Sequence, residues 1–418
     1  MQTRLSPEFA GTPEGLEAEA ILRKCVHCGF CTATCPTYQL LGDELDGPRG
    51  RIYLMKQVLE GEKPTRKTQM HLDRCLTCRN CESTCPSGVQ YGHLLDIGRK
   101  IVDAKVPRPT PEKALRWALK EGLPSPLFAP AMKMGQAVRG LLPAALQAKV
   151  PAKQEAGAWP TRSHARKVLM LAGCVQPSMM PNINAATARV LDAAGIQTVI
   201  APKAGCCGAV KFHLNDQDGG RAEMRANIDA WWPMIASGEV EALVMNASGC
   251  GVTVREYGHF LKDEPAYAAK AQRIGELTRD LSELLPAIVA ALRQSRPERV
   301  PGPPAGYAGA GRHLAFHPPC SLQHGQQLRG GVEQHLAAFG FKVQVARSES
   351  HLCCGSAGTY SVLNPDLSHK LRDRKLGHLG ELEPDVIVSA NIGCITHLQS
   401  GTPTPVRHWV EVLDEHLR

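Results

Sequence analysis

The chain has 418 residues, of which 43% are hydrophobic, and this length is enough for two to four globular domains. Its longest apolar runs, such as LLPAIVAAL, are too short to cross a membrane as a helix, which excludes an integral membrane protein built from helices. The net charge of +8 is spread along the chain and forms no basic block, so nothing supports nucleic-acid binding.

The N-terminal stretch MQTRLSPEFAGTPEGLEAEA lacks the apolar core of a secretion signal. The chain nevertheless contains sixteen cysteines, and in a long chain without a signal these favour metal sites in a reducing compartment over a disulfide framework. We therefore expect a cytoplasmic protein whose contact with a membrane is at most peripheral, on the inner face of the cytoplasmic membrane.

Two cysteine runs near the N-terminus, CVHCGFCTATCP at 25–36 and CLTCRNCESTCP at 75–86, share the spacing C-x2-C-x2-C-x3-C-P. In two-cluster ferredoxins, three cysteines of such a run hold one 4Fe-4S cluster and the fourth ligates the other cluster. Zinc also accepts four thiolates, but paired cysteines usually suffice for it. We predict two 4Fe-4S clusters, the first held by Cys25, Cys28, Cys31 and Cys85 and the second by Cys75, Cys78, Cys81 and Cys35.

The segment between these runs, PRGRIYLMKQVLEG at 48–61, has apolar residues at helical spacing. We therefore expect residues 1–105 to form an alpha-helical ferredoxin domain. Residues 106–165 are rich in proline and alanine with few strand formers, which predicts a connector of short helices joined by turns. Its stretch KMGQAVRGLLPAALQAK is basic and apolar enough to touch a membrane surface, but packing against another domain is the favoured use.

From residue 166 onward the chain repeats itself. Four cysteines recur at offsets of 146, 147, 147 and 144 residues: Cys174, Cys206, Cys207 and Cys250 match Cys320, Cys353, Cys354 and Cys394. In both copies, strand-like apolar runs lead to the cysteines and an amphipathic helical segment separates the first two runs. This order predicts parallel α/β sheets whose carboxyl ends bring the cysteines together. We expect a first unit at 166–296 and a second unit at 312–418, joined by a Pro/Gly-rich linker at 297–311.

Each unit thus offers four thiolates, which suit either a 4Fe-4S cluster or zinc, and buried unligated thiols are a third interpretation. The units differ in their histidines. His317, His324 and His351 lie near the second cysteine set, whereas Leu171 and Ala204 match His317 and His351 in the first unit. We hypothesise that the second unit handles protons beside a terminal acceptor, and a structural role at strand ends is the alternative.

The paired CCG motifs behind a two-cluster ferredoxin run resemble the cysteine-rich (CCG) domain family, which is found in the heterodisulfide reductase B subunit, the anaerobic glycerol-3-phosphate dehydrogenase C subunit and lactate-utilisation proteins. Both N-terminal stretches, CVHCGFCTATCPTYQLLGDELDGPRGRIYLMKQVLEG and LDRCLTCRNCESTCPSGVQYGHLLDIGRK, are most similar to the iron-sulfur subunits of bacterial glycolate oxidases. The resemblance covers nearly the whole chain. It implies an α + α/β fold, in which an N-terminal alpha-helical ferredoxin domain with two 4Fe-4S clusters precedes a duplicated α/β cysteine-rich (CCG) domain.

The resemblance also implies an oxidoreductase that oxidises glycolate to glyoxylate, with a flavoprotein catalytic subunit and a second, flavoprotein-like subunit as partners. No G-x-G-x-x-G fingerprint follows a predicted strand here, so we place FAD on the partner subunits and not on this chain. A 2-hydroxy acid releases two electrons together and a cluster accepts one, so this chain is expected to pass electrons from the partner flavin toward quinone or another respiratory acceptor. It is expected to hold no catalytic residue and not to oxidise substrate alone.

Three alternatives remain open at this stage. The complex oxidises lactate or glycerol 3-phosphate instead of glycolate, the chain is a heterodisulfide-reductase-like thiol-disulfide enzyme, or it is a zinc-stabilised scaffold. The heterodisulfide reductase pattern ends each unit with CxxC and so has five cysteines and a non-cubane cluster. Here Ala247 and Asn391 replace the first cysteine of that pair, which argues against heterodisulfide cleavage. A further 4Fe-4S cluster or zinc, in one or both units, and an empty site stay open.

Overall fold

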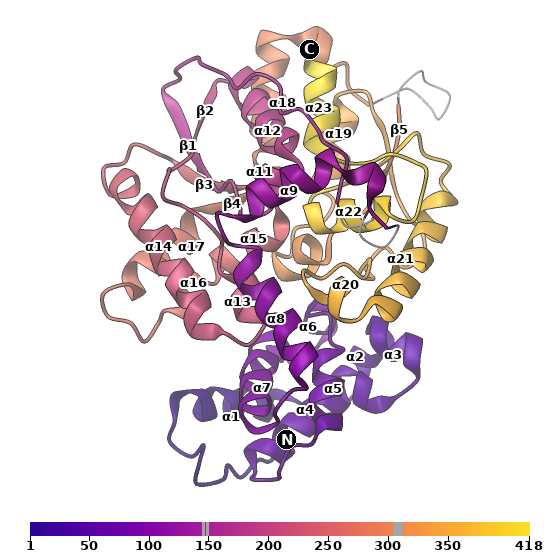
Figure 1. The fold of residues 1–418 in the computed structure, drawn as a ribbon. Helices are drawn as coiled ribbons and strands as arrows, with labels where there is room; N and C mark the ends of the chain where they lie inside the picture. Colours follow the sequence, from indigo (N-terminus) through magenta and orange to yellow (C-terminus); the bar gives the residue numbers. More distant parts are fainter. Residues whose placement is uncertain (144–146, 148–149, 304–311) are drawn as a thin grey trace.

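The structure is a computed structural model, and it describes residues 1–418 with the exception of 144–146, 148–149 and 304–311 (Figure 1). All regular elements of residues 1–105 are helices, as predicted. They are α1 (Pro13–Lys24), α2 (Phe30–Ala33), α3 (Pro36–Leu41), the 3-10 helix η1 (Glu44–Asp46), α4 (Pro48–Leu59), α5 (Arg66–Asp73), α6 (Asn80–Thr84) and α7 (Tyr91–Lys105). The helix expected within 48–61 is α4.

Helix α7 is the centre of this N-terminal part, because α1, α4 and α5 all pack against it. Leu22, Leu72 and Leu94 are at most 1% exposed and belong to the same apolar core. A side chain at Gly98 would come within 2.4 Å of the sulfur of Met55, so the glycine allows α4 to lie close to α7. The packing of α4 and α7 therefore depends on this small residue.

The connector forms the predicted short helices, namely α8 (Thr110–Gly122), α9 (Phe128–Ala137) and the 3-10 helix η2 (Arg139–Leu141). Helix α8 packs against α13 (Ala209–His213), and α9 packs against α11 (Gln176–Met179), so the connector runs along the first unit (Figure 1). The end of its basic and apolar stretch falls partly outside the described residues. Within the described chain, no helix has both the length and the apolar character needed to span a membrane.

Each unit contains a four-stranded parallel sheet, and the two sheets have the same strand order. In the first unit β1 (Arg166–Met170), β2 (Ile196–Val199), β3 (Ala242–Met245) and β4 (Thr278–Asp280) are arranged as β2-β1-β3-β4. In the second unit β5 (His313–Phe316), β6 (Lys342–Val345), β7 (Val386–Ser389) and β8 (Val406–His408) are arranged as β6-β5-β7-β8. The predicted duplication of a parallel α/β unit is confirmed.

The remaining helices of both units flank the sheets. The first unit contains α11, α12 (Pro181–Ala193), α13, α14 (Gln217–Ala236), α15 (Ser248–Arg255), α16 (Tyr257–Phe260), α17 (Ala268–Leu277), η3 (Leu281–Leu284) and α18 (Leu285–Ser295). The second contains the π-helix η5 (Ser321–Gly325), α19 (Gly331–Ala338), α20 (Tyr360–Leu363), α21 (Pro365–Gly380), α22 (Ile392–Gln399) and α23 (Trp409–Leu417). The predicted linker begins with the 3-10 helix η4 (Pro297–Arg299), and its residues 304–311 lie outside the described residues.

The two units pack as a pseudo-twofold pair. Helix α12, which precedes β2, packs on α23 of the second unit, and its counterpart α19 packs on α18 of the first. One continuous apolar core includes Val244 of the first sheet together with Phe316 and Trp409 of the second unit. Arg189 of α12 also donates to the carboxylate of Asp414 in α23 at 2.8 Å. The repeat is therefore one body with a shared interior, in which each unit covers the other.

A buried charge network joins the segments around the two cysteine runs. Asp46 is fully buried, and Arg51, which is 1% exposed, donates to its Oδ1 at 3.3 Å. Arg51 also donates from Nε to the carbonyl of His71 at 2.7 Å, and Arg74 donates to Oδ2 of Asp46 at 2.9 Å. The network therefore links the segment after the first run to the segment that leads into the second.

Replacing Asp46 tests this network. Asp46→Asn leaves the buried Arg51 guanidinium without an anionic partner, so we expect the free energy of unfolding of the N-terminal part to fall by about 3–5 kcal/mol. Chemical unfolding followed by circular dichroism under anaerobic conditions measures it. The control Glu44→Gln removes the carboxylate of the part-exposed pair with Arg49 and should cost no more than about 1 kcal/mol. Equal losses in the two variants would contradict the role of the network.

Candidate metal centres

The two N-terminal cysteine runs fold into the same kind of loop. His27 and Gly29 in the first run have φ values of 55° and 85°, and Thr77 and Arg79 in the second have values of 53° and 57°. Residues with a side chain rarely adopt this left-handed backbone conformation, and non-glycine residues held in it are typical of functional loops. The turns reverse the backbone between cysteines, and α2 or α6 then carries the third cysteine of each run.

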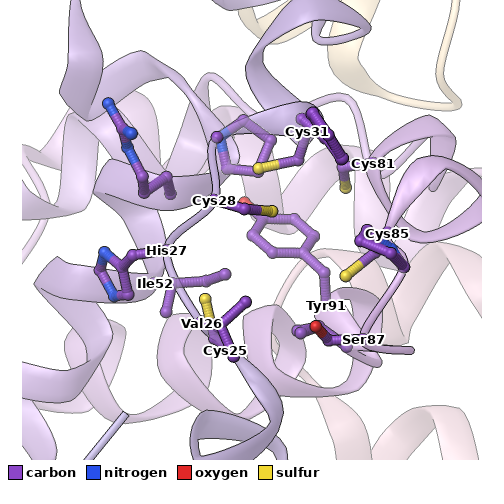
Figure 2. Close-up of a pocket in the computed structure, with 16 residues that line it drawn as sticks. Cys25, Val26, His27, Cys28, Cys31, Ile52, Cys81, Cys85, Ser87 and Tyr91 are labelled. Carbon is purple, nitrogen blue, oxygen red and sulfur yellow. The ribbon is translucent and has the colours of Figure 1, made fainter.

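The first predicted ligand set surrounds a single hollow of about 440 Å³ that opens to solvent. Figure 2 shows the sulfurs of Cys25, Cys28, Cys31 and Cys85 pointing toward its interior, with Tyr91 behind them. Cys25 is buried, whereas Cys28 is exposed at the mouth of the hollow. Cys85 belongs to the second run, so the structure brings all four cysteines of the predicted set together from both runs, with Cys81 of the second run on the same wall.

The second predicted set lines a neighbouring hollow of about 310 Å³, whose walls include Cys35, Cys75, Cys78 and Cys81. The hydroxyl of Tyr91 donates to the sulfur of Cys75 at 3.6 Å, and the backbone N–H of Thr77 donates to it at 3.4 Å. Cys81 also borders the first hollow. The two ligand sets therefore lie side by side and share walls.

The donor chemistry of both hollows fits a thiophilic metal group. Burial, reinforced by neighbouring thiols, raises the pKa of Cys31 to about 11 and raises the pKa values of Cys78 and Cys81 well above their usual value. Without a cation these thiols stay protonated. A metal displaces the protons and stabilises the thiolates that bind it, so the buried sets suit a metal-bound state.

The repeated cysteines also converge, at the carboxyl ends of the parallel strands. In the first unit Cys174 follows β1, the pair Cys206 and Cys207 follows β2, and Cys250 follows β3. Hydrogen bonding to the sulfur of Cys206, together with burial, raises the pKa values of Cys174 and Cys207. In the second unit the sulfurs of Cys320 and Cys353 lie 3.8 Å apart, and Cys354 contacts both Cys353 and Cys394.

The glycine after each adjacent pair has a structural reason. Gly208 and Gly355 have φ values of +93° and +92°, and a side chain at these positions would come within 2.7 Å of the carbonyl of Gly220 in α14 and within 2.5 Å of the carbonyl of Ser368 in α21. Their N–H groups donate to the sulfurs of Cys206 and Cys353, at 3.4 Å in both units. Glycine thus allows α14 and α21 to pack closely against the cysteine turns of their units.

Of the three histidines named from the sequence, His317 and His324 have different surroundings. A ring nitrogen of His317 lies within 4.8 Å of the sulfurs of Cys354 and Cys394. His324 instead points to the N-terminal part, where its Nδ1 is 2.8 Å from the hydroxyl of Ser83. Burial lowers the pKa of His317 well below its usual value and that of His324 to about 4. Both rings are therefore neutral at physiological pH, which counts against the hypothesised proton handling.

The second cysteine run is held between the two units. Arg79, between Cys78 and Cys81, forms a bidentate ion pair with Glu256, which lies between α15 and α16. One of the two contacts measures 2.7 Å. On the other side Asn80 donates to the carbonyl of His351 at 3.3 Å. A small apolar cluster packs Leu76 and Cys78 of this run against Tyr360, Leu371, Cys320 and Cys353 of the second unit. Sequence reasoning missed this docking, because no local pattern links residues so far apart.

Removing the carboxylate of Glu256 tests the docking. Burial raises the pKa of Glu256, but His93 and Arg79 together lower it to about 2, so the pair is ionic at neutral pH. Glu256→Gln leaves Arg79 buried without its anion. We therefore expect the free energy of local opening of residues 75–85 to fall by about 3 kcal/mol. Hydrogen exchange of the anaerobic protein measures this opening.

The matched control is Glu264→Gln, which removes a part-exposed pair with Arg225 inside the first unit. It should leave the exchange of residues 75–85 unchanged, because surface pairs contribute no more than about 1 kcal/mol. Unchanged exchange in Glu256→Gln as well would show that the ion pair does not hold the second run in place.

Comparison with known proteins agrees with this architecture. Residues 21–89 match the family "4Fe-4S dicluster domain", and residues 168–255 and 314–399 each match the family "Cysteine-rich domain". The chain is 54% identical to the "Glycolate oxidase iron-sulfur subunit" of Escherichia coli (strain K12) over 419 residues, which cover 100% of this chain and 99% of that protein.

More distant relatives share the same parts. The "Probable glycolate oxidase iron-sulfur subunit" of Bacillus subtilis (strain 168) is 30% identical over 416 residues, covering 92% of this chain and 89% of that protein. The "Lactate utilization protein A" of Bacillus licheniformis is 25% identical over 259 residues, covering 59% of this chain and 99% of that protein. With its two cysteine-rich units behind a dicluster domain, and with such identity along its entire length, the chain belongs to the family of glycolate oxidase iron-sulfur subunits.

Proposed function

We propose that this chain is the electron-transfer subunit of a glycolate oxidase complex, in which glycolate is oxidised to glyoxylate on a partner. Its partners are a flavoprotein catalytic subunit and a second, flavoprotein-like subunit, which carry FAD. Electrons pass from the partner flavin toward quinone or another respiratory acceptor, at the inner face of the cytoplasmic membrane. The observation that carries this proposal is the full-length identity of 54%, together with two cysteine-lined hollows in the dicluster region.

We assign the ligands of two 4Fe-4S clusters to the two hollows. Cys25, Cys28, Cys31 and Cys85 hold the first, and Cys75, Cys78, Cys81 and Cys35 hold the second. Such clusters supply transfer of one electron at a time, and their potential is tuned by hydrogen bonds to the sulfurs. Here the Tyr91 hydroxyl and the Thr77 N–H donate to the sulfur of Cys75, so they are the residues that adjust the second set.

The two hollows differ in their access to partners. The first opens beside Val26 and Phe30, which are 67% and 61% exposed, and its ligand Cys28 is exposed as well. An apolar, exposed rim suits contact with another subunit. The second set faces the second unit through the cluster around Leu76 and Cys353. We therefore propose that the flavoprotein partner approaches the first hollow, and that the second lies on the route to the repeated units.

For the repeated units we propose metal binding by Cys174, Cys206, Cys207 and Cys250 and by Cys320, Cys353, Cys354 and Cys394, as a further 4Fe-4S cluster or zinc in one or both. The adjacent pairs are between 1% and 4% exposed, so a disulfide substrate has no access to them. This burial argues against a thiol-disulfide enzyme. The domain boundaries that accompany this proposal are 1–105, 106–165, 166–296, 297–311 and 312–418.

The substrate is tested with the assembled complex. The chain is coexpressed with the flavoprotein subunits of its own organism, and dye reduction is measured with glycolate, lactate and glycerol 3-phosphate in turn. We expect glycolate to give the highest kcat/KM, since the full-length relatives are glycolate oxidase subunits. A higher value for lactate or glycerol 3-phosphate would assign the complex to that substrate instead.

The role of the two N-terminal sets is tested by single serine replacements. Cys28→Ser and Cys78→Ser should remove nearly all quinone reduction by the complex, while glycolate still reduces the partner flavin, because only the later one-electron path is broken. Stopped-flow spectra of the flavin and a quinone assay separate these two steps. Ser87→Ala changes a wall of the first hollow that offers no thiolate, and should leave both steps intact. Quinone reduction that survives both cysteine replacements would refute the assignment.

A further inference from the structure

A further donor, the imidazole of His317, lies near two of the four cysteines of the second set. This residue follows directly after β5 and is 1% exposed. Its backbone N–H donates to the carbonyl of Val388 at 2.8 Å, and its carbonyl accepts from the hydroxyl of Ser389 at 2.9 Å. Because both contacts fix its backbone to β7, the sheet sets the position from which the ring extends.

The ring nitrogens of His317 are unsatisfied hydrogen-bonding groups. Neither Nδ1 nor Nε2 makes a hydrogen bond within the described part of the chain, although the ring is enclosed. A buried polar group without a partner costs free energy, so such a group in a folded protein calls for an explanation. One ring nitrogen lies within 4.8 Å of the sulfurs of Cys354 and Cys394, which themselves lie within the same distance of each other.

The first unit shows that the fold does not require a histidine here. Leu171 occupies the matching position after β1 and is 4% exposed, so an apolar side chain fills the same space. The two sheets share one strand order, and the change from leucine to histidine therefore concerns chemistry and not packing.

We propose that His317 is a ligand of the metal in the second unit, where it binds together with the thiolates of Cys354 and Cys394. The first unit then holds a centre with thiolate ligands alone. This inference rests on the metal sites proposed above for the repeated cysteine sets. Thiolates with a neutral imidazole suit both zinc and the iron of an iron-sulfur centre, and in an iron-sulfur centre histidine ligation raises the reduction potential above that of an all-cysteine site.

The test uses the full chain, purified anaerobically, and begins with iron and zinc content per chain. Cys354→Ser identifies the metal that depends on the second set. His317→Leu, which copies the first unit, should lose the same metal, whereas His317→Cys should keep it because a thiolate replaces the imidazole. His351→Gln is the matched control, since its side chain belongs to the same region but is not within the group of close donors. Circular dichroism confirms that each variant is folded.

A spectroscopic readout then shows the nitrogen itself. If the metal is iron, pulsed electron paramagnetic resonance of protein labelled with 15N-histidine should show a strongly coupled nitrogen that disappears in His317→Cys. If it is zinc, X-ray absorption at the zinc edge should show a nitrogen at about 2.0–2.1 Å beside sulfurs at about 2.3 Å. In His317→Cys the same measurement should show sulfur neighbours only.

The possible failures are distinguishable. Full metal content in Cys354→Ser would show that the second set binds no metal, and both this inference and the metal assignment would fall. Cys354→Ser could lose the metal while His317→Leu keeps full metal and an unchanged nitrogen signal. That result would overturn only the role of His317. Neither result would touch the two N-terminal clusters or the electron-transfer role.

Discussion

The crowding of buried thiols is the constraint on which the rest of the structure depends. All sixteen cysteines are free, and they are gathered into four groups in which burial and neighbouring sulfurs raise the pKa of most of the affected thiols. Thiols held in this way add little to the stability of the fold as isolated groups, but a metal stabilises their thiolate forms. On the proposed assignment of metal sites, metal binding and folding are coupled, and the free energy of metal binding contributes directly to the stability of the fold.

Two unrelated scaffolds meet this constraint. In residues 1–105, left-handed turns and short helices wrap cysteines around hollows that lie side by side. In the repeated units, the carboxyl ends of parallel strands bring loops together, as in other open α/β sheets where ligands bind at that edge. The second cysteine run joins the two scaffolds, because Arg79 binds one unit while Asn80 and the cluster around Cys78 contact the other.

The sequence was sufficient for features with a local or periodic signal. Cysteine spacing predicted two ligand sets drawn from both runs, and the structure places each set around a hollow, with Cys81 bordering both. The repeat of the CCG motif predicted two parallel sheets. It was not sufficient for β4 and β8, which have three residues each with an arginine at the centre, too short for a pattern. Nor did it reveal the pseudo-twofold packing of α12 on α23 or the ion pair of Arg79 with Glu256, because long-range contacts depend on how finished elements meet in space.

The most direct test of the account is the iron and acid-labile sulfide content of the chain, purified without oxygen together with its flavoprotein partners. Two 4Fe-4S clusters held by the N-terminal sets require about eight irons and eight sulfides per chain, and any further iron belongs to the repeated units. A fully folded protein with zinc in place of this iron, and without acid-labile sulfide, would contradict an electron-transfer role and identify the chain as a structural scaffold.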